Sequence, residues 1–125
     1  MQSNNRANKR VLIADDEPGI RELLEEILTL RGIEVEVAAS GIEAIAALER
    51  HSFDLAILDL LMPGTPGSDV ARYIKSNTPD MPIVIITGSD VETIEKSLQG
   101  ISVTKVIRKP FEMEEISTVV TKLLD

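Results

Sequence analysis

The chain has 125 residues, a formal net charge of −8 and no cysteine, and its hydrophobic and aromatic contents are 43% and 2%. This length predicts one globular domain, and the lack of cysteine excludes disulfides and thiolate metal sites. An acidic domain repels the phosphates of nucleic acids and anionic membranes, so we expect direct contact with neither. No stretch of about 18 apolar residues is present, which argues against a membrane-spanning helix.

Residues 1–8 are polar and lack the apolar middle region of a secretory signal. We interpret them as a flexible tail or the remnant of a linker, and residues 9–125 as the domain. Since the chain shows neither a signal nor a membrane segment, we expect a cytoplasmic protein.

The first predicted element is the apolar run 11–14, a short buried strand that ends at two acids. Pro18 suits the first turn of the helix that follows, and residues 34–37 alternate as in a half-exposed edge strand. Ser40 and Glu43 form a capping box that begins a second helix.

The apolar runs 55–58 and 83–86 predict two further buried strands. Ser68 or Asp69 is predicted to cap the helix between them. A second capping box, residues 89–92, begins the next helix.

The last two predicted elements are the mixed run 103–108, expected to be the other edge strand, and a C-terminal helix. The apolar stripe of that helix predicts a face in the core, made of Met113, Ile116, Val120 and Leu123. Strand and helix thus alternate five times, which indicates an α/β domain of (βα)5 type whose parallel sheet has helices on both faces.

The hydrophobicity of the strands predicts their order. The first, third and fourth are wholly apolar and therefore central, whereas the second and fifth are mixed and peripheral. This matches a doubly wound five-stranded parallel sheet of order 2-1-3-4-5. Such sheets bind ligands at the carboxyl ends of their strands, at the switch point between the first and third strands.

Reactive side chains follow four of the five strands. Three carboxylates in one crevice would repel one another, and a Mg2+ ion bound through oxygen atoms would remove that cost. A lysine and a hydroxyl could hold phosphate oxygens beside them. These groups together suit transfer of a phosphoryl group onto a carboxylate. The residues are Asp15 and Asp16 after the first strand, Asp59 after the third, Thr87 after the fourth and Lys109 after the fifth.

Four motifs occur in a fixed order: Val-Leu-Ile-Ala-Asp-Asp-Glu-Pro at 11–18, Asp-Leu-Ala-Ile-Leu-Asp-Leu-Leu-Met-Pro-Gly at 54–64, Ile-Ile-Thr-Gly at 85–88 and Lys-Pro-Phe at 109–111. Each alone is a weak signal, but their combination is specific. From residue 9 to residue 124 the chain resembles the receiver domains of two-component response regulators. The resemblance implies a flavodoxin-like receiver fold.

The resemblance also implies a role for each matching residue. Asp59 would accept a phosphoryl group from a histidine of a sensor kinase or a histidine phosphotransfer protein. Thr87 and Lys109 would hold the phosphoryl oxygens, and the Lys109–Pro110 peptide bond would be cis. The Mg2+ ligands would be the side chains of Asp16 and Asp59, the backbone carbonyl of Leu61 and, through a bound water, Asp15.

Such a domain assists only its own phosphorylation and dephosphorylation and is not otherwise an enzyme. Phosphorylation would change the surface of the fourth helix, fifth strand and fifth helix, which would bind a downstream protein or form a homodimer. The family usually has Tyr or Phe three residues before the lysine, where this chain has Val106. We therefore expect the switch to be read by another route.

Two other functions are weighed against this one. A Mg2+-dependent hydrolase that forms an aspartyl phosphate usually has a second aspartate two residues after the nucleophile, where this chain has Leu61. A pseudo-receiver that only binds proteins usually lacks an acid or the lysine, and this chain has kept both. Purely structural roles are the remaining alternative: helix caps for Asp15 and Asp16, a turn residue for Asp59, a strand-end hydroxyl for Thr87 and a solvated charge for Lys109.

Overall fold

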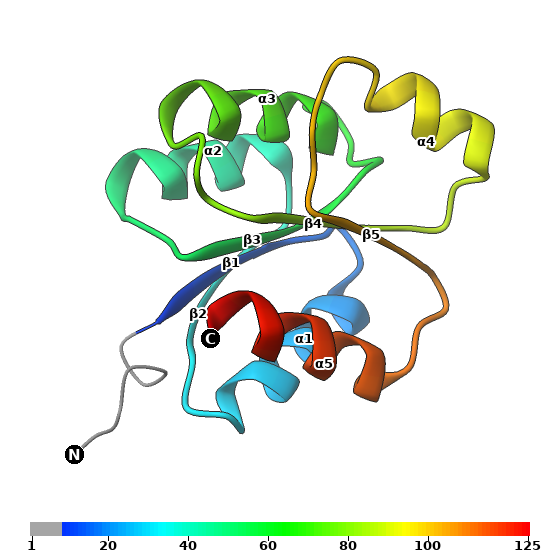
Figure 1. Ribbon diagram of the computed structural model, residues 1–125. Helices are drawn as coiled ribbons and strands as arrows, with labels where there is room; N and C mark the ends of the chain where they lie inside the picture. Colours follow the sequence, from blue (N-terminus) through cyan, green and yellow to red (C-terminus); the bar gives the residue numbers. More distant parts are fainter. Residues whose placement is uncertain (1–8) are drawn as a thin grey trace.

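A computed structural model describes residues 9–125, in which five strands alternate with five helices (Figure 1). The predicted tail, residues 1–8, lies outside the described residues. The strands are β1 (Arg10–Ala14), β2 (Glu34–Ala38), β3 (Leu55–Asp59), β4 (Ile83–Thr87) and β5 (Lys105–Arg108). The helices are α1 (Pro18–Thr29), α2 (Gly41–Arg50), α3 (Gly67–Asn77), α4 (Val91–Ser97) and α5 (Met113–Leu124).

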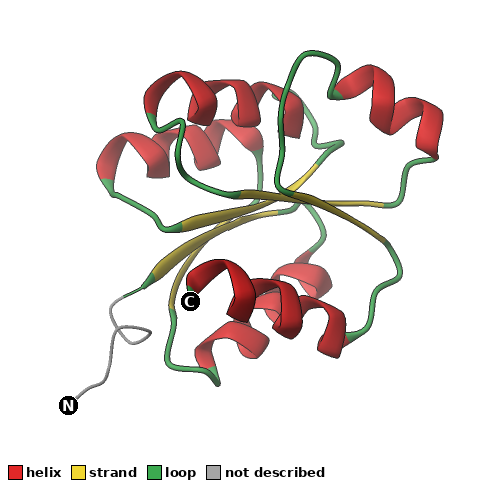
Figure 2. Ribbon diagram, viewed as in Figure 1, coloured by secondary structure: helices red, strands yellow, loops and turns green. Residues whose placement is uncertain are grey.

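The strands form one parallel sheet in the order β2-β1-β3-β4-β5. The predicted α/β fold and strand order are therefore confirmed. Helices α2, α3 and α4 lie on one face of the sheet, and α1 and α5 lie on the other (Figure 2). The carboxyl ends of β1 and β3 meet at the switch point of this doubly wound arrangement.

The three central strands are buried on both faces, as their apolar runs predict. Successive side chains point to opposite faces, so each strand contributes to two separate apolar clusters. The cluster beneath α2 and α3 includes Leu12, Ala56, Leu58, Ile83 and Ile85. The cluster beneath α1 and α5 includes Val11, Ile13, Ile57, Val84 and Ile86.

The capping box at the start of α2 is confirmed. The Ser40 hydroxyl accepts a hydrogen bond from the Glu43 amide at 3.2 Å, and the Glu43 carboxylate accepts one from the Ala39 amide at 2.9 Å. The first bond satisfies an amide that the helix itself leaves unpaired, and the second satisfies the amide of the residue before the cap.

Replacing Ser40 with alanine should therefore lower the free energy of unfolding by about 1 kcal/mol. Urea unfolding followed by circular dichroism measures the change. Ser76→Ala, at an exposed position of α3, is the matched control and should change stability by less than about 0.5 kcal/mol. Equal effects of the two substitutions would show that the cap contributes nothing specific.

The predicted caps of α3 and α4 were wrong. Helix α4 is capped by Asp90, whose side chain accepts from the Thr93 amide at 2.8 Å, while the Ser89 amide instead donates to the Thr87 hydroxyl. Helix α3 begins at Gly67 because the chain folds back there, and the Gly67 amide donates to the carbonyl of Leu60 at 2.8 Å. Neither residue predicted to cap α3 does so.

The last strand and helix differ from the prediction in their details. Strand β5 begins at Lys105 instead of residue 103. The buried stripe of α5 is Ile116, Val120 and Leu124, and Met113, at the first helical position, is 51% exposed. Including Met113 in the core was therefore wrong, because the buried stripe begins one turn later.

Helix α4 is attached to the domain less firmly than the other helices. None of its seven residues is buried. Half-buried Ile94, together with Leu98 at the helix end, packs beside Val103 and Val106 against the α2–α3 cluster. Val106, at the position where the family resemblance implies an aromatic residue, is a half-buried aliphatic side chain in this group.

Candidate functional site

The carboxyl ends of four strands bring the predicted site residues into one place. Asp59 is the last residue of β3 and Thr87 the last of β4, Lys109 follows β5, and Asp15 and Asp16 follow β1. A shallow cleft of about 420 Å3 opens here, and Asp16, Asp59, Thr87 and Lys109 line it. The parallel sheet thus gathers all the predicted residues, although they are up to about a hundred positions apart in sequence.

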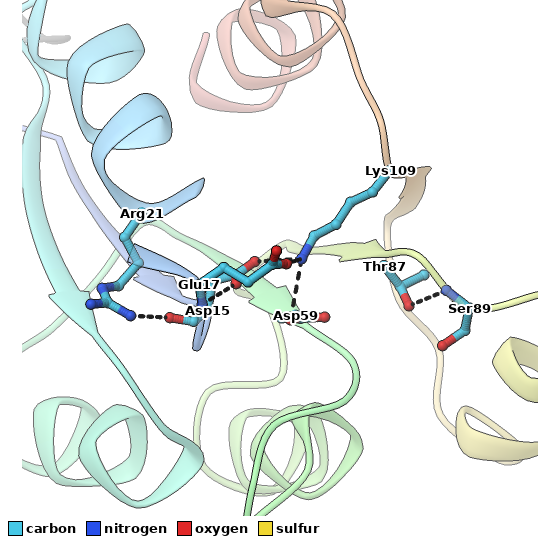
Figure 3. A network of polar contacts seen from close by, with 7 residues as sticks. All are labelled: Asp15, Glu17, Arg21, Asp59, Thr87, Ser89 and Lys109. Atoms are coloured by element: carbon cyan, nitrogen blue, oxygen red, sulfur yellow. Dashed lines mark hydrogen bonds and ion pairs between the residues drawn. The ribbon is translucent and has the colours of Figure 1, made fainter. Parts of the chain in front are cut away.

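The Lys109 ammonium group lies among three carboxylates (Figure 3). Its Nζ atom is 2.5 Å from Glu17 Oε1, 3.0 Å from Asp15 Oδ2 and 3.3 Å from Asp59 Oδ2. Burial alone would lower the pKa of Lys109, but the contacts with Glu17, Asp15 and Asp59 outweigh it and hold the pKa above its ordinary value. The ammonium group therefore stays charged.

Asp59 is a buried carboxylate whose pKa lies above its ordinary value. It is 6% exposed. Burial and the nearby charge of Asp15 raise the pKa of Asp59 to about 6, although Lys109 and a backbone hydrogen bond from Leu61 oppose the shift. Near neutral pH the group is ionised and therefore able to act as a nucleophile.

Asp15 lies deepest among the acids of the site. Only 1% of its surface is exposed. Its Oδ1 accepts from the Glu17 amide at 2.9 Å, and its carbonyl accepts from the Arg21 guanidinium at 2.7 Å. Its buried Oδ2 has no hydrogen bond among the described residues, because the ion pair with Lys109 lacks hydrogen-bond geometry.

The unsatisfied oxygen and the crowding of like charges indicate a site that suits a cation. Asp15, Asp16, Glu17 and Asp59 can each present one carboxylate oxygen, and these oxygens lie within 4.8 Å of one another. An all-oxygen set is what Mg2+ prefers. Three of the four acids were predicted from the sequence. The fourth, Glu17, was missed because a glutamate before Pro18 has the ordinary appearance of a helix start.

Thr87 and Leu61 lie on the sides of the same cleft. The Thr87 hydroxyl is buried and accepts from the Ser89 amide at 3.0 Å. Leu61 is 55% exposed and presents an apolar side chain. The Lys109–Pro110 peptide bond is cis, as the family resemblance implies. The chemical roles assigned to these residues remain predictions.

Gly67 also shapes the site, and the sequence analysis did not single it out. A Cβ atom at this position would lie 2.0 Å from the carbonyl oxygen of Asp59 and 3.0 Å from the Cα of Leu60. The first residue of α3 therefore packs directly on the backbone that carries Asp59. Only glycine allows so close an approach.

Within residues 9–125, every helix is too short or too polar to cross a lipid bilayer.

Comparisons with known proteins agree with this geometry. The family model for the response regulator receiver domain matches residues 11–121. The response regulator TrrA of Thermotoga maritima, solved in complex with Mg2+-BeF, is 36% identical with a TM-score of 0.82, over 92% of this chain and 98% of that one. A CheY-like receiver domain protein of Methanospirillum hungatei is 28% identical with a TM-score of 0.88, over 94% of each chain.

Longer curated relatives match in the same region. The response regulator MprA of Mycobacterium sp. (strain KMS) is 32% identical over 109 residues, which are 86% of this chain and 46% of the relative. A probable transcriptional regulator, ycf27 of Cyanidium caldarium, is 35% identical over 129 residues, 99% of this chain and 51% of the relative. The chain thus spans about half the length of the curated relatives it matches. It belongs to the response regulator receiver domain family of two-component systems.

Proposed function

We propose that this receiver domain is a phosphoacceptor, which takes a phosphoryl group onto Asp59 in a Mg2+-dependent step and then changes the proteins it binds. One observation carries the proposal: a buried carboxylate at the end of a central strand lies 3.3 Å from a lysine ammonium group and within a cluster of three other acids. Buried carboxylates beside a specific charged partner in a cleft are typical of functional sites.

The chemistry follows from the groups present. A carboxylate oxygen of Asp59 attacks the phosphorus atom of a phosphohistidine, a P–O bond forms, and the P–N bond breaks with its electron pair returning to the imidazole ring. Lys109 is close enough to place its positive charge against the transferred oxygens. The Thr87 hydroxyl, which also lines the cleft, can donate to the same group once it is present.

The acidic residues would hold the metal that this transfer uses. The side chains of Asp16 and Asp59, the carbonyl of Leu61 and, through water, Asp15 are the proposed ligands, and Glu17 is near enough to join them. A bound Mg2+ would neutralise charge on the phosphoryl oxygens. That the similar response regulator TrrA was solved in complex with Mg2+-BeF supports a role for Mg2+, without identifying the ligands in this chain.

The proposed partners are a sensor histidine kinase or a histidine phosphotransfer protein, and an unidentified downstream protein. The surface of α4, β5 and α5 is the proposed output face, either for that protein or for a homodimer. With a net charge of −8, the chain itself is not expected to contact nucleic acid. We further propose a cytoplasmic location, and no enzymatic activity beyond the domain's own phosphorylation and dephosphorylation.

Intact-protein mass spectrometry tests the function directly. With Mg2+ and acetyl phosphate, the wild-type chain should gain one phosphoryl group, and neither Asp59→Asn nor wild type with excess chelator should do so. Sustained hydrolysis of phosphomonoesters would instead favour the hydrolase. If the wild type gained no mass, the pseudo-receiver would be favoured.

Leu61 is expected to make the aspartyl phosphate long-lived. Its exposed apolar side chain lines the cleft and offers no group to orient an attacking water. Leu61→Asn should speed dephosphorylation about two- to tenfold, since one added hydrogen bond to that water is worth about 0.5–1.5 kcal/mol. The decay of phosphorylated protein after removal of the donor measures this rate. Leu61→Val is the matched control and should decay like wild type; an unchanged rate in the Asn variant would refute the prediction.

A further inference from the structure

Glu17 makes the shortest contact with Lys109, although the proposed transfer does not require it. Glu17 Oε1 accepts from Lys109 Nζ at 2.5 Å, while the oxygens of Asp15 and Asp59 lie 3.0 and 3.3 Å from the same nitrogen (Figure 3). The Glu17 side chain is 58% exposed, whereas the other two acids are buried. The ammonium group is thus held most closely by the outermost acid.

The backbone of Glu17 is held by hydrogen bonds, whereas its side chain is largely exposed. The Glu17 amide donates to Asp15 Oδ1, and its carbonyl accepts from the amides of Ile20 and Arg21, both at 3.1 Å. Glu17 is the N-cap residue of α1, yet its side chain makes no capping hydrogen bond. The carboxylate therefore serves the lysine and not the helix, and rotation of the side chain alone would release Lys109.

We propose that Glu17 is a positioning residue that retains Lys109 in the resting domain and competes with the group on Asp59 for its ammonium. The inference rests on the proposed phosphoacceptor function. An ammonium group has three N–H donors, and here three carboxylates surround it. A phosphoryl oxygen that approaches the ammonium group therefore competes with these negative charges for it. Glu17 is the least costly to release, because water can solvate its exposed carboxylate far better than the buried carboxylates of Asp15 and Asp59.

Beryllofluoride, which with Mg2+ mimics an aspartyl phosphate, is the probe for this competition. Its affinity is measured by NMR titration of backbone amides in wild type, Glu17→Gln and Glu17→Asp. The glutamine keeps the size and removes the charge. The aspartate keeps the charge but is one methylene shorter, and as a favoured N-cap residue it turns its carboxylate toward the amides of α1.

Both variants should bind beryllofluoride about two- to fivefold more tightly than wild type. This is the range expected when the exposed ion pair between Glu17 and Lys109 no longer stabilises the resting domain. Because Glu17 also lies in the acid cluster that could hold the metal, the affinity for Mg2+ alone is measured for each variant, so that weaker metal binding is separated from the competition for Lys109. Glu22→Gln removes a charge from an exposed position of the same helix and should leave both affinities unchanged.

Several results would overturn the inference. Tighter binding in Glu17→Gln alone would indicate an effect of net charge, and no change in either variant would show that Glu17 does not compete. If wild type binds beryllofluoride and the variants match it, only this inference fails. If wild type binds none at all, the proposed function fails with it.

Discussion

Gly67→Ala is expected to lower the free energy of unfolding by about 3 kcal/mol or more. The added Cβ would lie 2.0 Å from the carbonyl oxygen of Asp59, so the contact is with backbone and no rotamer change can relieve it. Either α3 or the end of β3 must shift, and both belong to the core. Urea unfolding followed by circular dichroism should show the loss, and the folded fraction should accept phosphoryl groups poorly because Asp59 is displaced.

Gly19→Ala is the matched control. Gly19 lies in the first turn of α1, and nothing lies within 4 Å of a Cβ placed there. Alanine favours a helix over glycine, so this variant should be unchanged or more stable by up to about 1 kcal/mol. Equal free energies of unfolding in the two variants would mean that the close approach of Gly67 to the Asp59 backbone does not require glycine.

Asp59→Asn should stabilise the metal-free domain by about 2 kcal/mol near neutral pH. The folded pKa of Asp59 is about 6, above its ordinary value of 3.8. The folded state therefore binds the proton more tightly than the unfolded state does. Ionisation of Asp59 accordingly costs stability as pH rises from about 4 to about 6, and the cost is constant above that range. A shift of about two pKa units corresponds to about 3 kcal/mol as an upper bound.

The pH dependence makes this prediction specific. The stability difference between Asp59→Asn and wild type should be largest above about pH 7 and should disappear near pH 4, where the native carboxyl group is protonated. Adding Mg2+ should narrow the difference, because the cation stabilises only the wild-type site. Asp69→Asn, at an exposed surface pair with Arg72, should change stability by less than about 0.5 kcal/mol at any pH. A pH-independent difference would contradict the assigned cause.

Much of the fold could be predicted because its signals are local. The apolar runs that became β1, β3 and β4 are buried along their whole length, and their contrast with the mixed runs at the edges was enough to order the sheet. Once the order was known, the site residues after β1, β3, β4 and β5 had to converge, since parallel strands end at the same edge.

The errors came from features that depend on side-chain direction or on distant contacts. Ser89 and Asp90 are both good cap residues, and sequence alone could not show that the Ser89 amide is used by Thr87. Met113 fits the helical period, but whether the first turn of α5 packs on the sheet depends on tertiary contacts that the local sequence does not specify. Glu17 was missed for the same reason, because its proximity to Lys109 arises only when β1 and β5 occupy one sheet.

The loose attachment of α4 affects which conformations the resting domain populates. Because this helix buries none of its residues and rests on half-buried Ile94 and Leu98, displacing it from the position seen here should cost little free energy. A gap of about 1.4 kcal/mol changes the ratio of two conformers tenfold. One charge-assisted hydrogen bond gained or lost at the neighbouring Thr87 is of that size. The resting domain is therefore expected to sample displaced positions of α4, so that a partner can select one before any phosphoryl group arrives.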